Sequence, residues 1–316
     1  MKILVTGGAG FIGSNVVDAY VKAGHDVAIV DNLSSGKREN LNPKALFHQV
    51  DIRSEELRGL IKSERPDIIN HHAAQISVPA SVENPLYDAD VNVKGFINLL
   101  EAARLNKTKK VVFISSGGAI YGEAQEYPTT EKYPAQPLSP YAITKFVSEK
   151  YLAFYNHHYG LDYTVLRYAN VYGPRQIPHG EAGVVAIFMD RLLNSSPCSL
   201  YHFKDEPRGM TRDYCFVGDI ARANLMALDR GSAEAFNIGT GVATHTEELF
   251  NLIYGSIKRA RAIPDELKFP QKGPARAGDI KRSCLNIEKA GKTLGWGPET
   301  GLKEGIEETL KWRLRK

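Results

Sequence analysis

The feature that most constrains the fold is a set of three glycines near the start of the chain. Gly7, Gly10 and Gly13 come directly after the apolar run Ile3-Leu4-Val5 and directly before a helix-like stretch from about Gly13 to Ala23. Glycines in this context let the backbone turn tightly from a strand into a helix, whose free N–H groups favour an anion such as a pyrophosphate. The pattern therefore predicts a turn that holds a dinucleotide.

The rest of the first half alternates β-branched runs with helix-like segments. Such alternation predicts parallel strands with helices on both faces, and strands buried on both sides read as continuous apolar runs. The fold class we expect is α/β, a Rossmann-type doubly wound parallel sheet with a smaller α/β substrate domain. The expected strands after the first are Val27–Val30, Phe47–Ile52, Ile68–His72 and Val111–Ile114, and the clearest helix between them runs from about Val91 to Leu105.

The pattern breaks after Val165-Leu166-Arg167, where glycine and proline become frequent. We therefore expect a Rossmann domain over residues 1–170, with about 211–240 returning to its sheet, and a second, more irregular domain over residues 171–316. The first domain is expected to bind the cofactor and the second the substrate.

The second expected strand ends in an acid, Asp31. Asp31 follows Gly13 at close to the ~20-residue distance at which a carboxylate holds the adenosine ribose hydroxyls. A carboxylate at that place would repel a 2′-phosphate, so the sequence predicts NAD in preference to NADP.

Composition excludes several other classes of protein. The net charge of +4 is spread over interspersed acidic and basic residues, so we expect no nucleic-acid partner. The longest apolar stretch, Ala182 to Met189, is too short to cross a bilayer, so we expect no membrane partner. Three cysteines form no disulfide framework, which fits a cytoplasmic enzyme. The adjacent pairs His71-His72 and His157-His158 cannot both face one ion, so no metal is expected.

The wider sequence resembles the extended short-chain dehydrogenase/reductases and, within them, the nucleotide-sugar 4-epimerases. The matching segments cover nearly the whole chain: Thr6 to Ser14, Asp31 to Gly36, His72 to Gln75, Asn92-Val93, Ser115 to Gly122, Ser139 to Lys145, Arg167 to Pro174 and Thr211 to Tyr214. The Asp31 to Gly36 text is specific to the epimerase branch, whereas the glycine motif is not. The resemblance implies an isomerase that interconverts UDP-glucose and UDP-galactose through a 4-keto intermediate, with NAD as cofactor.

The resemblance also implies which residues contact the cofactor. Phe11 and Ile12 belong to the glycine turn with Gly7, Gly10 and Gly13. Three groups complete the set: Asn32, Ser35 and Gly36 line the adenosine half, Asp51 and Ile52 flank the adenine, and Ala73, Ala74, Gln75 and Asn92 approach the nicotinamide.

Tyr141 and Lys145 are the expected acid–base pair. They stand four residues apart, which places them on one face of a helix. An unperturbed tyrosine ionises near ~10, and a nearby ammonium together with the cationic nicotinamide would favour the phenolate. Tyr141 could then take the proton from the sugar O4, while Lys145 would also hydrogen-bond the nicotinamide ribose. Tyr254 and Lys258 repeat the spacing, but in a C-terminal amphipathic stretch where we expect ordinary surface structure.

A hydroxyl should polarise the same sugar oxygen. The family carries it on a Ser or Thr shortly before a Tyr-Gly, here Tyr121-Gly122, and a subgroup with an extra glycine points to Ser116, with Ser115 as the alternative. Dehydratases and decarboxylases of the family place an acid after this hydroxyl, whereas here two glycines follow and the first acid is Glu123. A non-catalytic NAD-binding protein is a further alternative, although such relatives usually lose the tyrosine or the lysine.

The resemblance assigns the UDP-sugar partner to the later part of the chain. Arg212 and Arg276 would bind the diphosphate, Asp279 the uridine ribose and Asn170 the sugar-phosphate region. Ser283, four residues after Asp279, stands where a tyrosine in the family restricts the pocket and a small residue admits N-acetyl groups. The resemblance also implies a homodimer that packs the helices near Val91–Leu105 and after Tyr141 against their mates. Phe96, Leu99, Leu100, Phe146 and Leu152 could serve either the core or that interface.

Overall fold

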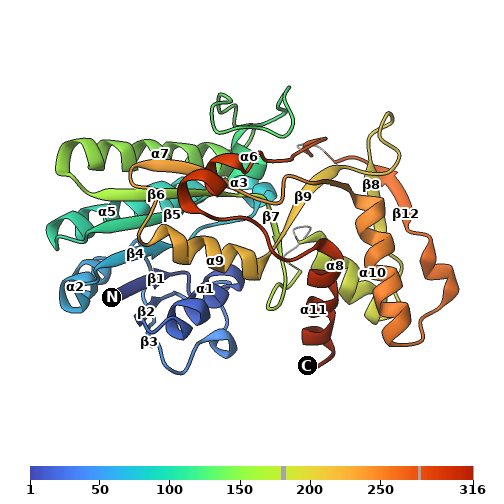
Figure 1. The fold of residues 1–316 in the computed structure, drawn as a ribbon, viewed down its shortest axis with the longest axis horizontal. Helices are drawn as coiled ribbons and strands as arrows, with labels where there is room; N and C mark the ends of the chain where they lie inside the picture. The colour runs from blue at the N-terminus through green and yellow to red at the C-terminus, as the bar shows by residue number, and fades with distance from the viewer. Residues whose placement is uncertain (179–182, 277–278, 316) are drawn as a thin grey trace.

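The computed structural model of the chain describes residues 1–178, 183–276 and 279–315. Its centre is a sheet of seven parallel strands in the order β10-β6-β5-β4-β1-β2-β3, which confirms the doubly wound α/β fold (Figure 1). The strands are β1 (Lys2–Thr6), β2 (Asp26–Val30), β3 (Leu46–His48), β4 (Ile68–His71), β5 (Lys110–Ser116), β6 (Asp162–Tyr168) and β10 (Glu234–Ile238). None of the helices in the described ranges is both long enough and apolar enough to cross a bilayer.

Helices cover both faces of this sheet because its strands are apolar on both sides. Ile3 and Val5 of β1 share a core with α1 (Phe11–Lys22) and α9 (Val217–Ala227), whereas Leu4 faces the opposite core. The helices of that second face are α2 (Glu56–Glu64), α5 (Gly95–Leu105) and α7 (Pro140–Tyr159). The alternation along each strand thus builds two hydrophobic layers, and the carboxyl ends of the strands meet at one edge.

Three expected elements differ from the sequence prediction. The expected strand Phe47–Ile52 is wrong in length, because β3 ends at His48 and the chain forms a turn at Ile52 and Arg53. The expected helix from Val91 begins as a π-helix, η2 (Asp90–Lys94), before α5. In the interval 211–240, the strand that joins the large sheet is β10, whereas β9 (Thr211–Phe216) joins a smaller one. Short helices complete this half: η1 (Arg38–Asn40), α3 (Val78–Glu83), α4 (Pro85–Ala89) and α6 (Gly117–Ile120).

The second half is built from two small sheets and three longer helices. Strands β11 (Ala243–His245), β9 and β7 (Asn170–Tyr172) form one sheet, and β12 (Gln271–Pro274) pairs with β8 (Ser199–His202) in the other. The helices are α8 (Val184–Leu193), α10 (Thr246–Ala260) and α11 (Leu302–Leu314), with the short helices η3 (Asp265–Lys268) and η4 (Ala290–Leu294).

A separate hydrophobic core holds these elements together, and it corrects one expectation. Tyr254 of α10 is only 9% exposed and belongs to this core, where its ring lies 6.2 Å from that of Phe250. The expectation of ordinary surface structure at Tyr254 is therefore wrong. An amphipathic helix buries one face, and Tyr254 lies on that face, whereas Lys258 pairs with Asp265.

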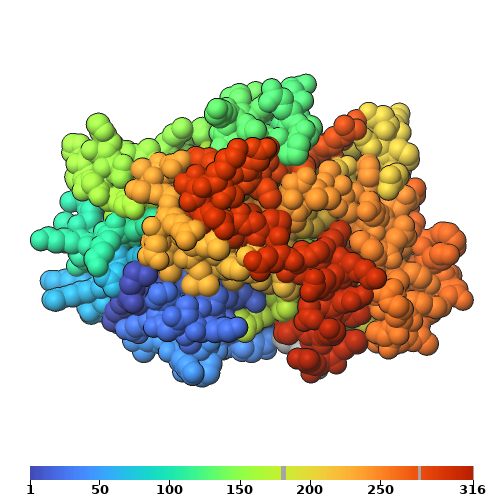
Figure 2. Space-filling model, in the orientation of Figure 1, coloured from blue at the N-terminus to red at the C-terminus, as the bar shows by residue number. Residues whose placement is uncertain are grey.

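The C-terminal segment joins the two halves. Ala290, Leu294 and Trp296 pack into the core beside α9, and the Trp296 indole N–H donates to the carbonyl oxygen of Asp219 at 2.9 Å. Further along, Ile306 of α11 packs into the second core. Figure 2 shows this segment, in red, lying over the surface of both halves.

Candidate active site

The glycine turn between β1 and α1 is closed so tightly that side chains would not fit. Gly7 has φ +70°, and a Cβ on it would lie 2.6 Å from the backbone nitrogen of Ala73. A Cβ on Gly13 would lie 2.2 Å from the carbonyl oxygen of Gly7. Gly10 is the N-cap and has no side chain to occupy the first N–H groups of α1, which include those of Phe11 and Ile12. This turn fits a dinucleotide pyrophosphate.

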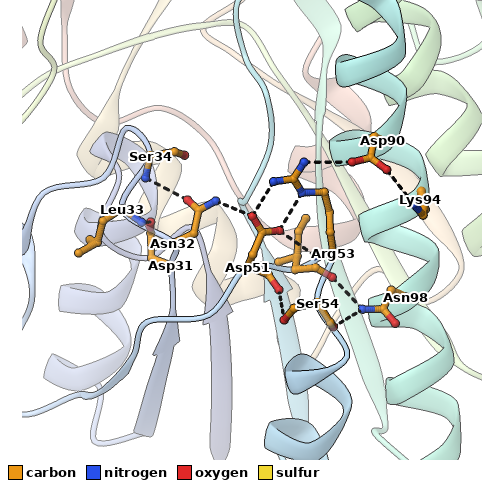
Figure 3. Close-up of polar contacts among 11 residues, drawn as sticks. Asp31, Asn32, Leu33, Ser34, Asp51, Arg53, Ser54, Asp90, Lys94 and Asn98 are labelled. Atoms are coloured by element: carbon orange, nitrogen blue, oxygen red, sulfur yellow. Dashed lines mark hydrogen bonds and ion pairs between the residues drawn. The ribbon is translucent and has the colours of Figure 1, made fainter.

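Among the residues predicted to line the adenosine and the adenine, Asp31, Asn32 and Asp51 make polar contacts beyond this turn (Figure 3). Asp31 accepts hydrogen bonds from the backbone N–H groups of Ala9 at 3.0 Å and Leu33 at 2.8 Å. A Cβ on Gly36 would lie 2.9 Å from the Asp31 carboxylate. The segment Ser35-Gly36 therefore passes close to Asp31. The Asn32 amide donates to Asp51 at 2.9 Å, which joins the two loops that follow β2 and β3.

Arg53, which the sequence analysis did not single out, fixes the adenine loop. Its guanidinium donates twice to Asp51, at 2.8 and 3.0 Å, and once to Asp90 at the start of η2, at 3.0 Å. Hydrogen bonds from Arg53 hold the pKa of Asp51 well below its usual range. The adjoining Ile52 carbonyl accepts a hydrogen bond from Asn98 of α5 at 2.9 Å. The signal in the sequence was only an arginine beside Asp51 and Ile52.

The nicotinamide-side residues lie at the end of β4. Ala73 donates its N–H to the hydroxyl of Thr6 at 3.3 Å, and Ala74 follows it in the same loop. Gln75 and Asn92 bond to each other twice: the Gln75 N–H donates to the Asn92 side chain at 2.8 Å, and the Asn92 amide donates to the Gln75 carbonyl at 3.0 Å. The structure thus brings the loop after β4 against η2.

Tyr141, Lys145 and Ser116 come together between β5 and the first turns of α7. Ser139 caps α7 by accepting the N–H of Ala142 at 3.2 Å, and Pro140 takes the first helical position. The Lys145 ammonium lies 5.9 Å from the centre of the Tyr141 ring and donates to the Ile114 carbonyl at 2.9 Å. Ser116 follows at the end of β5 and hydrogen-bonds the Tyr141 side chain.

The pKa values of this pair show what the chain alone contributes to the expected phenolate. Burial raises the pKa of Tyr141 to about 12, and the Ser116 hydrogen bond opposes that rise only in part. Burial also lowers the pKa of Lys145 to about 8. The chain alone therefore does not favour the phenolate, because burial raises the pKa of the phenol by more than the hydrogen bond with Ser116 lowers it.

The two candidate hydroxyls point to different partners. Ser115 is buried and donates to Glu149 at 2.6 Å, and Glu149 in turn is bound by Arg167 at 2.6 and 3.1 Å. Ser116 is the hydroxyl that reaches Tyr141. This geometry favours Ser116 over Ser115.

A cavity of about 330 Å³ in the second half contains four of the predicted substrate residues. Asn170, Arg212, Arg276 and Asp279 line it. Arg276 and Asp279 also pair with each other, through two bonds of 3.1 Å. The sequence analysis assigned no role to the remaining lining residues, of which only Tyr214 belongs to a motif: Gly183, Val184, Ile187, Phe188, Arg191, Ser199, Tyr201, Met210, Tyr214 and Thr246.

Arg212 is a cation in this cavity whose hydrogen bonds within the described residues all go to neutral acceptors. Its guanidinium donates to the backbone carbonyl of Thr211 at 2.9 Å, and burial lowers its pKa. Across the described ranges, no carboxylate lies within ion-pair distance of it. A partly buried cation with only neutral partners is costly, and an anionic ligand would relieve that cost.

Ser283 lies near Gly118, two residues after Ser116. A Cβ placed on Gly118 would lie 3.9 Å from the Ser283 hydroxyl and 3.6 Å from the Asn170 side chain. The backbone N–H of Ser283 donates to the Thr211 carbonyl at 3.0 Å, which fixes its position beside β9. Gly118, Asn170 and Ser283 therefore surround one space next to Ser116. Glu123, the first acid after Ser116, instead accepts the N–H of Lys281 at 2.7 Å.

The chain is similar in sequence and in fold to proteins of known structure. The family model described as "NAD dependent epimerase/dehydratase family" matches residues 3–239. The structure of UDP-glucose 4-epimerase with UDP-glucose from Thermotoga maritima is 46% identical, with a TM-score of 0.93, over 100% of this chain and 99% of that one. UDP-glucose 4-epimerase from Thermus thermophilus, in complex with NAD, is 44% identical, with a TM-score of 0.91 and coverage of 99% and 98%.

A third solved structure carries a different sugar specificity. UDP-N-acetylglucosamine 4-epimerase from Methanobrevibacter ruminantium M1, in complex with UDP-N-acetylmuramic acid, is 34% identical. Its TM-score is 0.91, and the match covers 99% of this chain and 98% of that one. Chains of this fold thus include enzymes that act on plain and on N-acetylated UDP-sugars.

Proposed function

Because this chain belongs to the NAD dependent epimerase/dehydratase family, we propose that it is a UDP-glucose 4-epimerase with NAD as its cofactor. It interconverts UDP-glucose and UDP-galactose through a 4-keto intermediate. The observation that carries this proposal is that Ser116 and Lys145 both lie beside Tyr141, at the sheet edge that bears the glycine turn. Asn170, whose side chain lies near Gly118, also lines the cavity that contains Arg212.

The chain supplies binding and proton transfer. Arg212 and Arg276 hold the diphosphate, Asp279 holds the uridine ribose, and Asn170 contacts the sugar-phosphate region. Tyr141 takes the proton from the sugar O4 and returns it, while the Ser116 hydroxyl polarises the same oxygen. Lys145 keeps a positive charge near the phenol and binds the nicotinamide ribose. NAD, when bound, supplies a reversible hydride acceptor for C4.

The cofactor residues are those of the turn and of the three loops at the sheet edge. The pyrophosphate lies on the turn that includes Gly7, Gly10, Phe11, Ile12 and Gly13. Asp31, Asn32, Ser35 and Gly36 hold the adenosine, Asp51 and Ile52 flank the adenine, and Ala73, Ala74, Gln75 and Asn92 adjoin the nicotinamide. We assign cofactor binding to residues 1–170 and sugar-nucleotide binding mainly to residues 171–316. The three free, buried cysteines support a cytoplasmic enzyme.

Conversion of UDP-galactose tests the proposal directly. Purified protein should form UDP-glucose from it, and NAD should co-purify and cycle without net consumption, because the hydride returns to the same sugar. Formation of NADH in proportion to turnover would identify a dehydrogenase. Formation of a dehydrated or decarboxylated product would identify a dehydratase or a decarboxylase, and binding of NAD without any product would identify a non-catalytic protein.

The small side chain at Ser283 predicts tolerance of an N-acetyl group at C2. Because the 4-keto sugar must turn over to present its other face, a C2 substituent passes through the space bounded by Ser283, Gly118 and Asn170. We expect wild type to accept UDP-N-acetylglucosamine or UDP-N-acetylgalactosamine, and Ser283→Tyr to lower kcat/KM for these more than for UDP-galactose. Equal effects on both classes of sugar, or no N-acetyl turnover by wild type, would remove Ser283 from this role.

We also propose a homodimer formed by α4, η2, α5 and α7. Phe96, Leu99, Leu100 and Leu152 are buried in the core of the chain, and Phe146 packs beside another core cluster, so other side chains must form the interface. Leu86 is 83% exposed and Phe154 is 48% exposed, and a hollow lined by Leu86, Ala89, Val93 and Ile97 lies on the same helices. Exposed apolar surface of this kind suits a second copy.

The mass in solution tests this interface. Light scattering at micromolar concentration should give twice the chain mass of 34.9 kDa for wild type. Phe154→Glu, which places a charge within the apolar surface, should shift the protein toward the monomer, whereas Phe269→Glu on a distant, 74% exposed side chain should not. A monomeric wild type would refute the proposal.

A further inference from the structure

Asp88 is a buried carboxylate that stands beside the catalytic helix without a cation. It is 0% exposed, at the last turn of α4. No lysine, arginine or histidine among residues 1–178, 183–276 and 279–315 forms an ion pair with it. Burying an ionised carboxylate is expensive unless hydrogen bonds replace its water. A buried charge at such a place is expected to have a role in the site.

Three side chains from three parts of the site donate to this carboxylate. The hydroxyl of Thr144 in α7 donates to it at 2.7 Å, the amide of Gln75 in the loop after β4 at 2.8 Å, and the amide of Asn92 in η2 at 3.1 Å. Thr144 lies between Tyr141 and Lys145 on α7. Asp88 therefore joins the catalytic helix to the two elements that adjoin the nicotinamide side.

The hydrogen bonds around Asp88 interlock. Gln75 and Asn92 bond to each other as well as to Asp88. The Ser148 hydroxyl, one turn beyond Thr144, donates to the Asn92 carbonyl at 3.1 Å. The carboxylate stands at the centre of this cluster, so its removal would take one acceptor from each of the three donors.

The charge of Asp88 also acts on the acid–base pair. It raises the pKa of Tyr141 and the pKa of Lys145. The other titratable groups that face Lys145 are Glu149 on α7 and the buried His71 and His72 at the end of β4. Burial favours the neutral amine, and the two carboxylates oppose this effect and favour the ammonium.

We propose that Asp88 is a positioning residue for the epimerisation: it holds α7 against the nicotinamide-side loop and keeps the ammonium of Lys145 charged. This assignment rests on the proposed function. Because Asp88 is 0% exposed, it acts through Thr144, Gln75 and Asn92 and through its charge.

Asparagine at this position separates the charge from the hydrogen bonds. The oxygen of an asparagine could accept from Gln75 and Asn92, and its amide could donate to Thr144, whose hydroxyl lies 3.0 Å from the Tyr141 carbonyl and could donate there. Asp88→Asn therefore keeps the cluster bonded but removes the negative charge. Thr144→Val removes the hydroxyl, and with it the bonds to Asp88 and from Asn92, but leaves the charge. Thr144→Ser restores the hydroxyl.

Titration of Lys145 by NMR tests the charge without relying on turnover. In protein with labelled lysine side chains, with the Lys145 signal identified from Lys145→Met, wild-type Lys145 should titrate near pH 8, where burial places its pKa. In Asp88→Asn the titration should move to lower pH by roughly one pH unit. Glu83→Gln, which removes a charge from the exposed end of α3, should leave it in place. An unmoved titration in Asp88→Asn would overturn the electrostatic part of the proposal.

Kinetics with UDP-galactose test the positioning. Thr144→Val should lower kcat roughly tenfold or more while KM changes little, because a small misplacement of Tyr141 slows the chemistry. Thr144→Ser should recover most of the rate. Equal rates for Thr144→Val and wild type would refute the positioning role, even if Asp88→Asn failed to fold. An inactive wild type whose Lys145 titration still moved in Asp88→Asn would refute the proposed function and leave the electrostatic assignment standing.

Discussion

Tyr141→Phe is expected to lower kcat by roughly 10²–10⁴, the usual value of positioned acid–base catalysis. The substitution keeps the ring between Ser116 and Lys145 and removes only the oxygen that exchanges the O4 proton. NMR of UDP-galactose and UDP-glucose over time measures the loss. Co-purified NAD should remain, because the ring is still present, and this separates a chemical defect from a loss of cofactor.

Tyr254→Phe is the matched control for this variant. Tyr254 has the same spacing to a lysine, but it lies in the core of the second half and not at the sheet edge. Its loss should leave kcat unchanged within about twofold. Near-normal activity of Tyr141→Phe would remove Tyr141 from the mechanism, and a dead Ser115→Ala beside an active Ser116→Ala would transfer the polarising role to Ser115.

The pH dependence should follow from the two pKa values. With the pKa of Tyr141 raised to about 12, the phenol holds its proton at neutral pH until positive charge near it stabilises the phenolate. Lys145, with a pKa of about 8, is mostly protonated at pH 7 and loses its charge as the pH rises through 8. The rate should therefore fall at low pH, because the phenolate is lost. Above about pH 8 the stabilisation of the phenolate by the Lys145 charge should weaken.

Arg212→Met is expected to weaken substrate binding by about 2–5 kcal/mol, or roughly 30- to 4,000-fold. The guanidinium lies in the cavity and its hydrogen bonds go to neutral acceptors, so the substrate diphosphate would be its charged hydrogen-bond partner. Binding of UDP by calorimetry measures the loss, and KM should rise with it. Because methionine fills a similar volume without an unpaired charge, the melting temperature should stay the same or rise.

Arg208→Met provides the control for Arg212. Arg208 is exposed and near Glu247 and Glu248, at 3.9 and 3.7 Å, so its removal subtracts the same charge without touching the cavity. UDP affinity should change little there, since exposed ion pairs contribute ~1 kcal/mol or less. Equal losses in the two variants would show a general electrostatic effect and not a diphosphate site at Arg212.

The first half was predictable from the sequence because its constraints are local. The glycine turn, the acid at the end of the second strand and the continuous apolar strands each reflect a requirement of one short segment. The helix starting at Pro140 was predictable for the same reason, since it begins with a cap and a proline.

The rest depends on contacts between distant segments. Lining residues such as Phe188 and Tyr201 converge on the cavity only when α8, β8 and β9 assemble. No spacing of residues within one segment predicts this assembly. The raised pKa of Tyr141 reflects burial by surrounding elements, which a four-residue spacing cannot reveal. Asp88 likewise resembles any surface acid until Gln75, Asn92 and Thr144 are seen around it.

The order in which the chain leaves the ribosome gives the C-terminal segment a particular importance. Trp296 completes the core beside α9, and Ile306 and Leu310 complete the core of the second half. Each half therefore exposes apolar surface during synthesis until this segment emerges, and premature termination before it would leave both halves open to aggregation. Removing the segment from Trp296 onward should consequently reduce the yield of native protein far more than removal of as many residues from surface loops.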